Sequence, residues 1–386
     1  PGALPGESVE IELLRSKRGA ARGRLERVIE RSNARRDPPC ADALRCGGCP
    51  LMIAEPSLQR EVKLGFLLEA CRDLPGASDV EVQWFESPDK LGYRRRARLA
   101  WHRNVIGYRQ PRSKRVTRID ECIVLVEPLR RAWNEVARCL ASSLRGDGEI
   151  QLQLTGDNRV VAMLASNDEQ APALYEACET LRDRPGIAGV ALRIGDAAQP
   201  AVWGSTRIVL QGADGLLEAP GGGFSQANDG VNARLVEEVA RLAEVGGAKV
   251  LELHAGVGNF TVALASDAKT LVAVEQDPRA VEACQRNLKA RGLRARVVAG
   301  DANQPPKGRF DVVVLDPPRQ GAKAFFESGS VLPDPARIVY VSCDTATLAR
   351  DLRLATAAGY RLDYVAGFDM FPQTAHLESI VRLVRA

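Results

Sequence analysis

Several kinds of segment are missing from this sequence of 386 residues. It has no run of about 18 apolar residues, so we expect no membrane-spanning helix. It has no secretory signal and no low-complexity tract, which favours a globular cytoplasmic protein. Pro1 stands where a methionine would begin a natural chain, so we expect the natural N-terminus to be missing. The length predicts two or three domains.

Acidic residues are absent from residues 90–118. This stretch has eleven Lys and Arg residues, interleaved with four aromatic or imidazole rings: Tyr93, Trp101, His102 and Tyr108. Basic groups neutralise phosphates, and aromatic rings stack on unpaired bases. A solvated basic hairpin is the simpler interpretation, but the length of the stretch and its aromatics favour nucleic acid. Arg95, Arg96 and Arg112 are the binding candidates.

Nine cysteines are present, and without a secretory signal they indicate thiols or metal ligands rather than disulfides. Four of them offer a set of thiolates that suits either zinc or an iron–sulfur cluster: Cys40, Cys46, Cys49 and Cys122. Only Cys46 and Cys49 form a close pair, whereas structural zinc sites more often show two such pairs. We interpret four others as core residues: Cys71, Cys139, Cys178 and Cys284.

Three regions differ in pattern. Residues 1–38 alternate apolar and polar side chains and predict a small β structure. Residues 39–220 mix short strands with helices and predict an α+β domain. After three consecutive glycines at 221–223, strands and helices alternate strictly, which predicts that residues 221–386 form a doubly wound α/β domain with a parallel sheet. Its predicted strands are 249–253, 270–274, 295–298, 311–315 and 337–341, followed by an antiparallel edge at 361–366 and 379–384.

A cofactor site is predicted at the carboxyl ends of these strands. Gly256 and Gly258 follow the first strand and allow a tight turn against a ligand. Glu275 ends the second strand, where an acid binds ribose hydroxyls, and Asp301 follows the third, where it accepts from an adenine amine. A dinucleotide fold needs a third glycine after Gly258, and its absence favours S-adenosylmethionine.

The next strand ends carry residues for chemistry. Asp316 is followed by two prolines and Arg319, where methyltransferases of amino groups carry an aromatic residue. A carbon target such as uracil C5 needs a nucleophile at C6, and Cys343 follows the strand 337–341 just before a helix. We expect that helix to lower the pKa of the thiol. Glu378 is the candidate base and His376 its competitor; an ordinary surface carboxylate is the alternative for Glu378.

These motifs, with the segment 224–228 (Phe-Ser-Gln-Ala-Asn), resemble those of the RNA 5-methyluridine methyltransferases. The resemblance implies that Cys343 is the nucleophile and that Glu378 removes the C5 proton. It also implies that Gln226, Asn259, Glu275 and Asp316 surround the cofactor and the target base, with Phe224 and Arg319 on the RNA. His254 and Ala255 stand where the family usually has an aromatic residue and a cysteine, which puts the cofactor contact at His254 in doubt.

The resemblance is closest to the ribosomal RNA members. It implies a [4Fe–4S] cluster on Cys40, Cys46, Cys49 and Cys122, a partial TRAM barrel in residues 1–38, and packing of residues 52–84 on the catalytic domain 221–386. It also implies a monomer acting on ribosomal RNA, with tRNA as the second substrate class. Two alternatives stay open: an RNA-binding iron–sulfur protein with an inactive methyltransferase domain, and an amino-group RNA methyltransferase.

Overall fold

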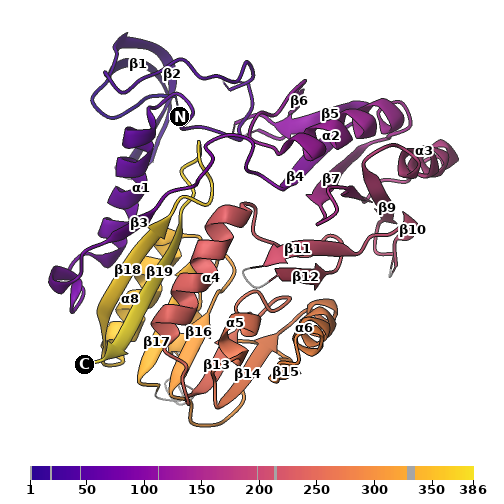
Figure 1. The fold of residues 1–386 in the computed structure, drawn as a ribbon. Coiled ribbons are helices and arrows are strands. Elements are labelled where there is room, and N and C mark those ends of the chain that lie inside the picture. The colour runs from indigo at the N-terminus through magenta and orange to yellow at the C-terminus, as the bar shows by residue number, and fades with distance from the viewer. Residues whose placement is uncertain are drawn as a thin grey trace.

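The computed structural model describes residues 2–17, 20–43, 45–111, 113–197, 199–212, 215–327 and 335–386. An N-terminal hairpin is followed by a domain around a seven-stranded sheet and a domain around an eight-stranded sheet (Figure 1). The candidate Arg112 lies outside the described residues. Within these ranges no helix combines the length and apolarity needed to cross a bilayer.

The N-terminal segment is a two-stranded antiparallel hairpin of β1 (Ser8–Lys17) and β2 (Ala20–Glu30). Both strands lie within residues 1–38, where the alternation of apolar and polar side chains predicted a small β structure. In the described residues they pair only with each other. The partial TRAM barrel therefore stays a prediction.

The central sheet has the order β10-β9-β8-β7-β4-β5-β6. All neighbours are antiparallel except β8 and β9. Its strands are β4 (Arg96–His102), β5 (Val105–Arg109), β6 (Val116–Arg118), β7 (Asp147–Leu154), β8 (Val160–Ser166), β9 (Ile187–Ile194) and β10 (Ala201–Gly204).

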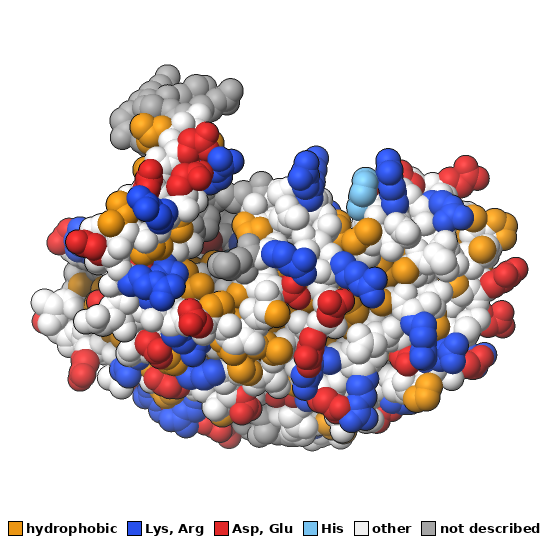
Figure 2. All heavy atoms as spheres, turned by 90° about the horizontal axis from the view of Figure 1, so that it is seen from above, with side chains coloured by type: hydrophobic (Ala, Val, Ile, Leu, Met, Phe, Trp, Pro, Cys, Tyr) orange, Lys and Arg blue, Asp and Glu red, His pale blue; other side chains and the backbone are white. Residues whose placement is uncertain are grey.

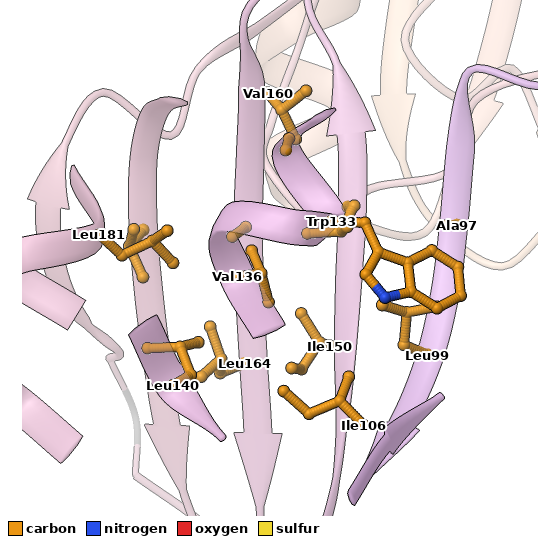
Figure 3. Close-up of a cluster of buried hydrophobic side chains, with 14 of the residues drawn as sticks. Ala97, Leu99, Ile106, Trp133, Val136, Leu140, Ile150, Val160, Leu164 and Leu181 are labelled. Atoms are coloured by element: carbon orange, nitrogen blue, oxygen red, sulfur yellow. The ribbon is translucent and has the colours of Figure 1, made fainter. Parts of the chain in front are cut away.

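Two helices, α2 (Glu127–Leu140) and α3 (Pro172–Arg182), cover this sheet. Trp133, Val136 and Leu140 repeat at helical spacing on α2, so they share the face that packs on the strands. Figure 3 shows these side chains in one cluster with Leu99 and Ile150 of the sheet. The helix ends at Leu140, and a turn at residues 141–143 leads to the buried Leu144.

The C-terminal sheet has the order β15-β14-β13-β16-β17-β19-β18-β3. The five strands from β15 to β17 are parallel, and β19 is antiparallel to both β17 and β18. The predicted doubly wound α/β domain is confirmed. Its strands are β13 (Lys249–Leu253), β14 (Thr270–Glu275), β15 (Arg296–Ala299), β16 (Val312–Leu315), β17 (Arg337–Ser342), β18 (Tyr360–Phe368), β19 (Glu378–Arg385) and β3 (Gln83–Phe85).

Helices cover both faces of this sheet. Successive residues along a strand point to opposite faces, and here the residues on both faces are apolar, so each face packs against helices. Leu251 and Val313 pack with α1 (Pro56–Cys71), α7 (Lys323–Glu327) and α8 (Thr345–Ala357). Their neighbours Val250 and Val312 pack with α4 (Asp229–Ala243) and α5 (Thr261–Ala265) on the other face. Helix α6 (Pro278–Ala290) packs against a separate β hairpin. The hairpin consists of β11 (Ile208–Gly212) and β12 (Gly215–Ala219).

The predicted closing pair of strands forms, but its place at the sheet edge was wrong. Strand β19 lies between β17 and β18, and the edge strand is β3, which runs parallel to β18. The rings of Phe85 and Phe368 stack at 4.6 Å between centroids. Helix α1 packs on α8, so residues that precede the central sheet in the chain contribute to the C-terminal one.

Candidate active site

A cavity of about 560 Å³ opens at the carboxyl ends of the parallel strands. It is lined from β13, β14, β16, β17 and β19, from the segment before α4, and from the connection between β18 and β19. Ten predicted residues line it: Phe224, Gln226, His254, Gly256, Asn259, Glu275, Asp316, Arg319, Cys343 and Glu378. His376 also lines it. Gly258 and Asp301 are predicted site residues outside this lining.

One end of the cavity is built around Glu275. Its Oε2 accepts from the Gly256 N–H at 2.8 Å, and its Oε1 accepts from the N–H groups of Gln276 and Asp277 at 2.8 Å. The positive φ of 57° at Gly256 suits a residue without a Cβ. Three backbone donors therefore hold the carboxylate in one orientation beside the apolar Val257 and Ala280.

Two asparagines face each other beside this turn. Asn232 Nδ2 donates to Asn259 Oδ1 at 3.0 Å, and Asn259 Nδ2 donates to Asn232 Oδ1 at 2.9 Å. The pair joins α4 to the glycine turn. Asn232 was not predicted from the sequence, since an asparagine at the start of a helix has many ordinary roles.

The other predicted residues near this turn have structural partners. A Cβ at Gly258 would lie 3.0 Å from Cys284 Sγ, so the glycine allows α6 to pack closely. Asp301 Oδ1 accepts from the backbone and side chain of Asn303 at 2.9 and 3.0 Å. His254 has a φ of 63°, unusual for a residue with a side chain. Burial lowers the pKa of its imidazole.

The opposite end brings together Asp316, Cys343 and Glu378. They lie at the ends of the neighbouring strands β16, β17 and β19. Ser342 pairs with Ser379 across β17 and β19, so Cys343 and Glu378 are adjacent to that pair on facing strands. The hydroxyl of Ser379 donates to the Ser342 carbonyl at 3.0 Å and fixes this register.

Burial dominates the electrostatics of this group. It raises the pKa of Asp316 to about 7. It also raises the pKa of Glu378 well above the usual range, and the nearby Asp316 carboxylate adds to this while Arg319 opposes it. A carboxyl group shifted in this direction holds a proton near neutral pH.

The predicted lowering of the Cys343 pKa was wrong. Burial raises the pKa of the thiol to about 12, with added repulsion from Glu378 and Asp316 and an opposing effect of Arg319. Cys343 precedes the N-cap of α8, and the Asp344 carboxylate accepts from the N–H groups of Ala346 and Thr347 at 3.1 and 2.9 Å. The helix terminus is thus satisfied by a neighbouring anion instead of by the thiol.

The backbone around Arg319 is held by α8. Thr347 Oγ1 donates to the Arg319 carbonyl at 3.1 Å, and Arg350 Nη2 donates to the Gln320 carbonyl at 2.7 Å. The fully buried Asp351 accepts from the Ala322 N–H at 2.6 Å and from the Tyr340 hydroxyl at 2.7 Å. These helix residues were not predicted, because each is an ordinary polar residue in sequence.

The cavity rim combines an exposed ring with arginines from the central sheet. Phe224 is 69% exposed, and the Arg96 guanidinium lies 5.6 Å from its ring centroid. Arg96 Nη1 donates to the Ser225 carbonyl at 2.9 Å, and Arg95 pairs with Asp229 at 2.9 Å. Arg96 therefore joins the central sheet to the segment before α4, and Arg95, just before β4, pairs with the first residue of α4.

Residues 90–118 contain no Asp or Glu, but acidic side chains from other segments lie beside them in the fold. Arg98 and Arg109 pair with Glu149, and Lys90 pairs with Asp369. Lys and Arg side chains are interspersed with Asp and Glu on the face seen in Figure 2. These ion pairs therefore neutralise part of the positive charge of residues 90–118.

The four cysteines predicted as metal ligands line one small cavity together with Met52 and Tyr108. Burial raises the pKa of Cys46 to about 11 and that of Cys49 to about 12, and the other thiols of the set add to both shifts. Across the described residues, however, no group of three or more His, Cys, Asp or Glu side chains has the arrangement to hold a metal ion. The four thiols share a cavity, but their arrangement is not that of ligands around a single metal ion.

Residues 218–329 match the methyltransferase small domain family, and residues 307–386 match the tRNA (uracil-5-)-methyltransferase family. The chain is 33% identical to the 23S rRNA (uracil(1939)-C(5))-methyltransferase RlmD of Pectobacterium atrosepticum, over 98% of this chain and 87% of that protein. It is 36% identical to the protein of the same name from Chromohalobacter salexigens, over 99% and 83%. The chain belongs to the RNA uracil-C5 methyltransferase family.

A solved structure supports the fold of this family member over nearly its whole length. The tRNA (uracil-54, C5)-methyltransferase of Pyrococcus abyssi, in complex with S-adenosyl-L-homocysteine, superposes with a TM-score of 0.74 at 23% identity. The superposition covers 97% of this chain and 93% of that one. The predicted family and α/β methyltransferase fold are therefore confirmed.

Proposed function

We propose that this chain uses S-adenosylmethionine to methylate the C5 carbon of a uridine in 23S ribosomal RNA. The observation that carries the proposal is one cavity with Cys343 and Glu378 at one end and the Glu275 turn at the other. The relatives named for 23S rRNA favour that substrate over tRNA. Ribosomal RNA as the substrate implies a cytoplasmic setting, and the monomer that the resemblance implies stays a prediction.

The residues at the Glu275 end fit S-adenosylmethionine. The oriented Glu275 carboxylate accepts hydrogen bonds from ribose hydroxyls. Val257, Ala280 and Leu217 provide apolar walls for an adenine ring. Gln226 and Asn259 line the path toward Asp316 and Cys343, where the methionine part and the base meet.

The Cys343 thiolate adds to C6 of the uracil, and the electron pair of the C5–C6 bond makes C5 nucleophilic. S-adenosylmethionine, when bound, supplies an electrophilic methyl group that C5 takes. Glu378 then removes the C5 proton, the C6–S bond breaks with its electron pair returning to sulfur, and the double bond reforms. This step needs Glu378 as the carboxylate, the form that the Arg319 charge favours, and the raised pKa makes that carboxylate a stronger base than an ordinary glutamate.

Arg319 has two roles in this scheme. It is the cation whose charge opposes the raised pKa of both Cys343 and Glu378, so it favours the thiolate and the carboxylate. It also occupies the position where an amino-group methyltransferase would stack an aromatic ring. This supports a carbon target over an exocyclic amine.

We also propose that Cys40, Cys46, Cys49 and Cys122 hold a [4Fe–4S] cluster. The support is that all four thiols line one cavity, in which Cys40 and Cys122 add to the raised pKa of both Cys46 and Cys49. A four-iron cluster is larger than a single ion, so its ligands stand further apart than those of one ion. Thiolates are its usual ligands.

The direct test is methyl transfer from labelled S-adenosylmethionine to 23S rRNA from cells that lack this protein. Nuclease mapping should place the label in 5-methyluridine at one position. RNA already methylated in wild-type cells is the matched control and should accept none. Label in a methylated amino group, or none in either RNA, would contradict the proposal.

A further inference from the structure

The connection between β18 and β19, residues 369–377, carries two side chains of the cavity lining, Phe371 and His376, and leads directly into Glu378. Gln373 lies in this connection and is 2% exposed. Its φ is 70°, a left-handed conformation that costs free energy for a residue with a side chain. Such a conformation persists only where the surrounding contacts impose it.

Every polar group of Gln373 has a partner in the N-terminal part of the chain. Its N–H donates to Gln59 Oε1 at 3.0 Å, and its carbonyl accepts from the Leu51 N–H at 3.0 Å. Its Oε1 accepts from Arg36 Nη2 at 2.9 Å and from Gln59 Nε2 at 3.0 Å. Its Nε2 donates to the Lys90 carbonyl at 3.1 Å.

Residues on either side of Gln373 are held by the same part of the chain. The buried Lys63 donates to Asp369 Oδ1 at 2.6 Å and to the Phe371 carbonyl at 3.0 Å. The Tyr93 hydroxyl donates to the Pro372 carbonyl at 3.0 Å. The connection is therefore shaped by contacts with residues 36–93, which lie far from it in the chain.

These contacts continue to the cysteine cavity. Arg36 Nε donates to the Met52 carbonyl at 3.1 Å, and the Met52 N–H donates to the Cys49 carbonyl at 3.2 Å. Met52 and Tyr93 also pack against Cys49 and Cys122. One set of contacts thus joins the cysteine segment to the connection that lines the active site.

We propose that Gln373 is a positioning residue, through which Arg36, Leu51 and Gln59 fix the connection that places His376 and Glu378 in the cavity. The proposal rests on the proposed function, because it names what aligns the same site. Loss of these hydrogen bonds frees the connection to leave its strained conformation. Glu378 and His376 then lose their alignment with Cys343, and misplacement by about 1 Å reduces catalysis by about a hundredfold.

The test uses the full chain with two variants. Gln59→Ala removes two hydrogen bonds to Gln373 and leaves the cavity lining untouched. Gln373→Gly removes the side chain while still allowing a positive φ, so its effect reports lost hydrogen bonds without added backbone strain. Gln83→Ala changes an exposed glutamine of the edge strand β3 and is the matched control.

The readouts are hydrogen exchange of residues 369–377, binding of S-adenosylmethionine, and the rate at which methylated product is released from an unmodified 23S rRNA transcript, because release requires removal of the C5 proton. Both variants should exchange faster in 369–377 and release product about ten- to a hundredfold more slowly at saturating concentrations. S-adenosylmethionine affinity should stay within about twofold, and Gln83→Ala should match the wild type in all three.

Exchange in residues 369–377 equal to the wild type in both variants would overturn the proposal, whatever the rate of product release. Faster exchange with an unchanged rate of product release would also overturn it, because the connection would then move without affecting the chemistry. If the wild type itself releases no methylated product, the proposed function fails, and exchange alone decides whether Gln373 holds the connection.

Discussion

Cys343 and Glu378 adjoin the Ser342–Ser379 pair of antiparallel strands, one residue after Ser342 and one before Ser379. The strand register therefore brings the two side chains to one end of the sheet, although they are 35 positions apart in sequence. Alternate residues of β17 and β19 pack in the two cores on either side of the sheet, so a slip by one residue would move each side chain into the opposite core and disrupt both. The core of the domain thus maintains the alignment of the proposed nucleophile and base.

Glu378→Gln separates methyl transfer from proton removal. Glutamine keeps the shape of the side chain but cannot take the C5 proton, so the variant should transfer one methyl group and stall. Mass spectrometry should detect protein joined to methylated, unfluorinated RNA. His376→Ala is the comparison: if that variant accumulates the joined species while Glu378→Gln turns over normally, the two roles are reversed.

The charges around Cys343 predict two opposite shifts in its titration. Asp316→Asn removes an anion that raises the thiol pKa, so alkylation by iodoacetamide should accelerate at lower pH than in the wild type. Arg319→Ala removes the opposing cation, so alkylation should need a higher pH. Free protein without RNA is used, with rates followed by mass from about pH 7 to 10. Shifts in the same direction for both variants would contradict the assigned electrostatics.

The exposed ring of Phe224 predicts a contact with RNA. Stacking of one base on an aromatic side chain contributes about 1–3 kcal/mol, so Phe224→Ala should weaken RNA binding by roughly five- to 150-fold. Its affinity for S-adenosylmethionine should stay unchanged. Phe66→Ala, at an exposed phenylalanine of α1, is the matched control. Equal RNA affinity of both variants and the wild type would remove Phe224 from the interface.

The cysteine cavity predicts iron in the protein. Anaerobically purified protein should be brown and contain about four irons per chain if one [4Fe–4S] cluster is bound. Cys46→Ser should bleach it, whereas Cys139→Ser, at a half-buried cysteine outside the cavity, should leave the colour unchanged. One zinc per chain and no iron would disprove the cluster.

The sequence predicted the parallel sheet and its cavity residues well, because strand–helix alternation and motifs such as Asp316-Pro317-Pro318-Arg319 are local. It missed β3, whose three residues form a strand only by pairing with β18, far along the chain. It missed Gln373 and Asp351 for a similar reason, since their partners come from distant segments or from the packed interior. The pKa of Cys343 was predicted in the wrong direction because burial and neighbouring carboxyl groups are set by the tertiary fold.

The central claim is that Cys343 bonds to C6 of the target uridine. The most direct measurement incubates the protein with S-adenosylmethionine and 5-fluorouridine-substituted 23S rRNA, then sequences the peptide that stays attached to RNA after denaturation. Fluorine at C5 cannot leave as a proton, so the account predicts a stable complex through the peptide that contains Cys343, and none with Cys343→Ala. Attachment through another residue, or methylation by Cys343→Ala at the wild-type rate, would contradict it.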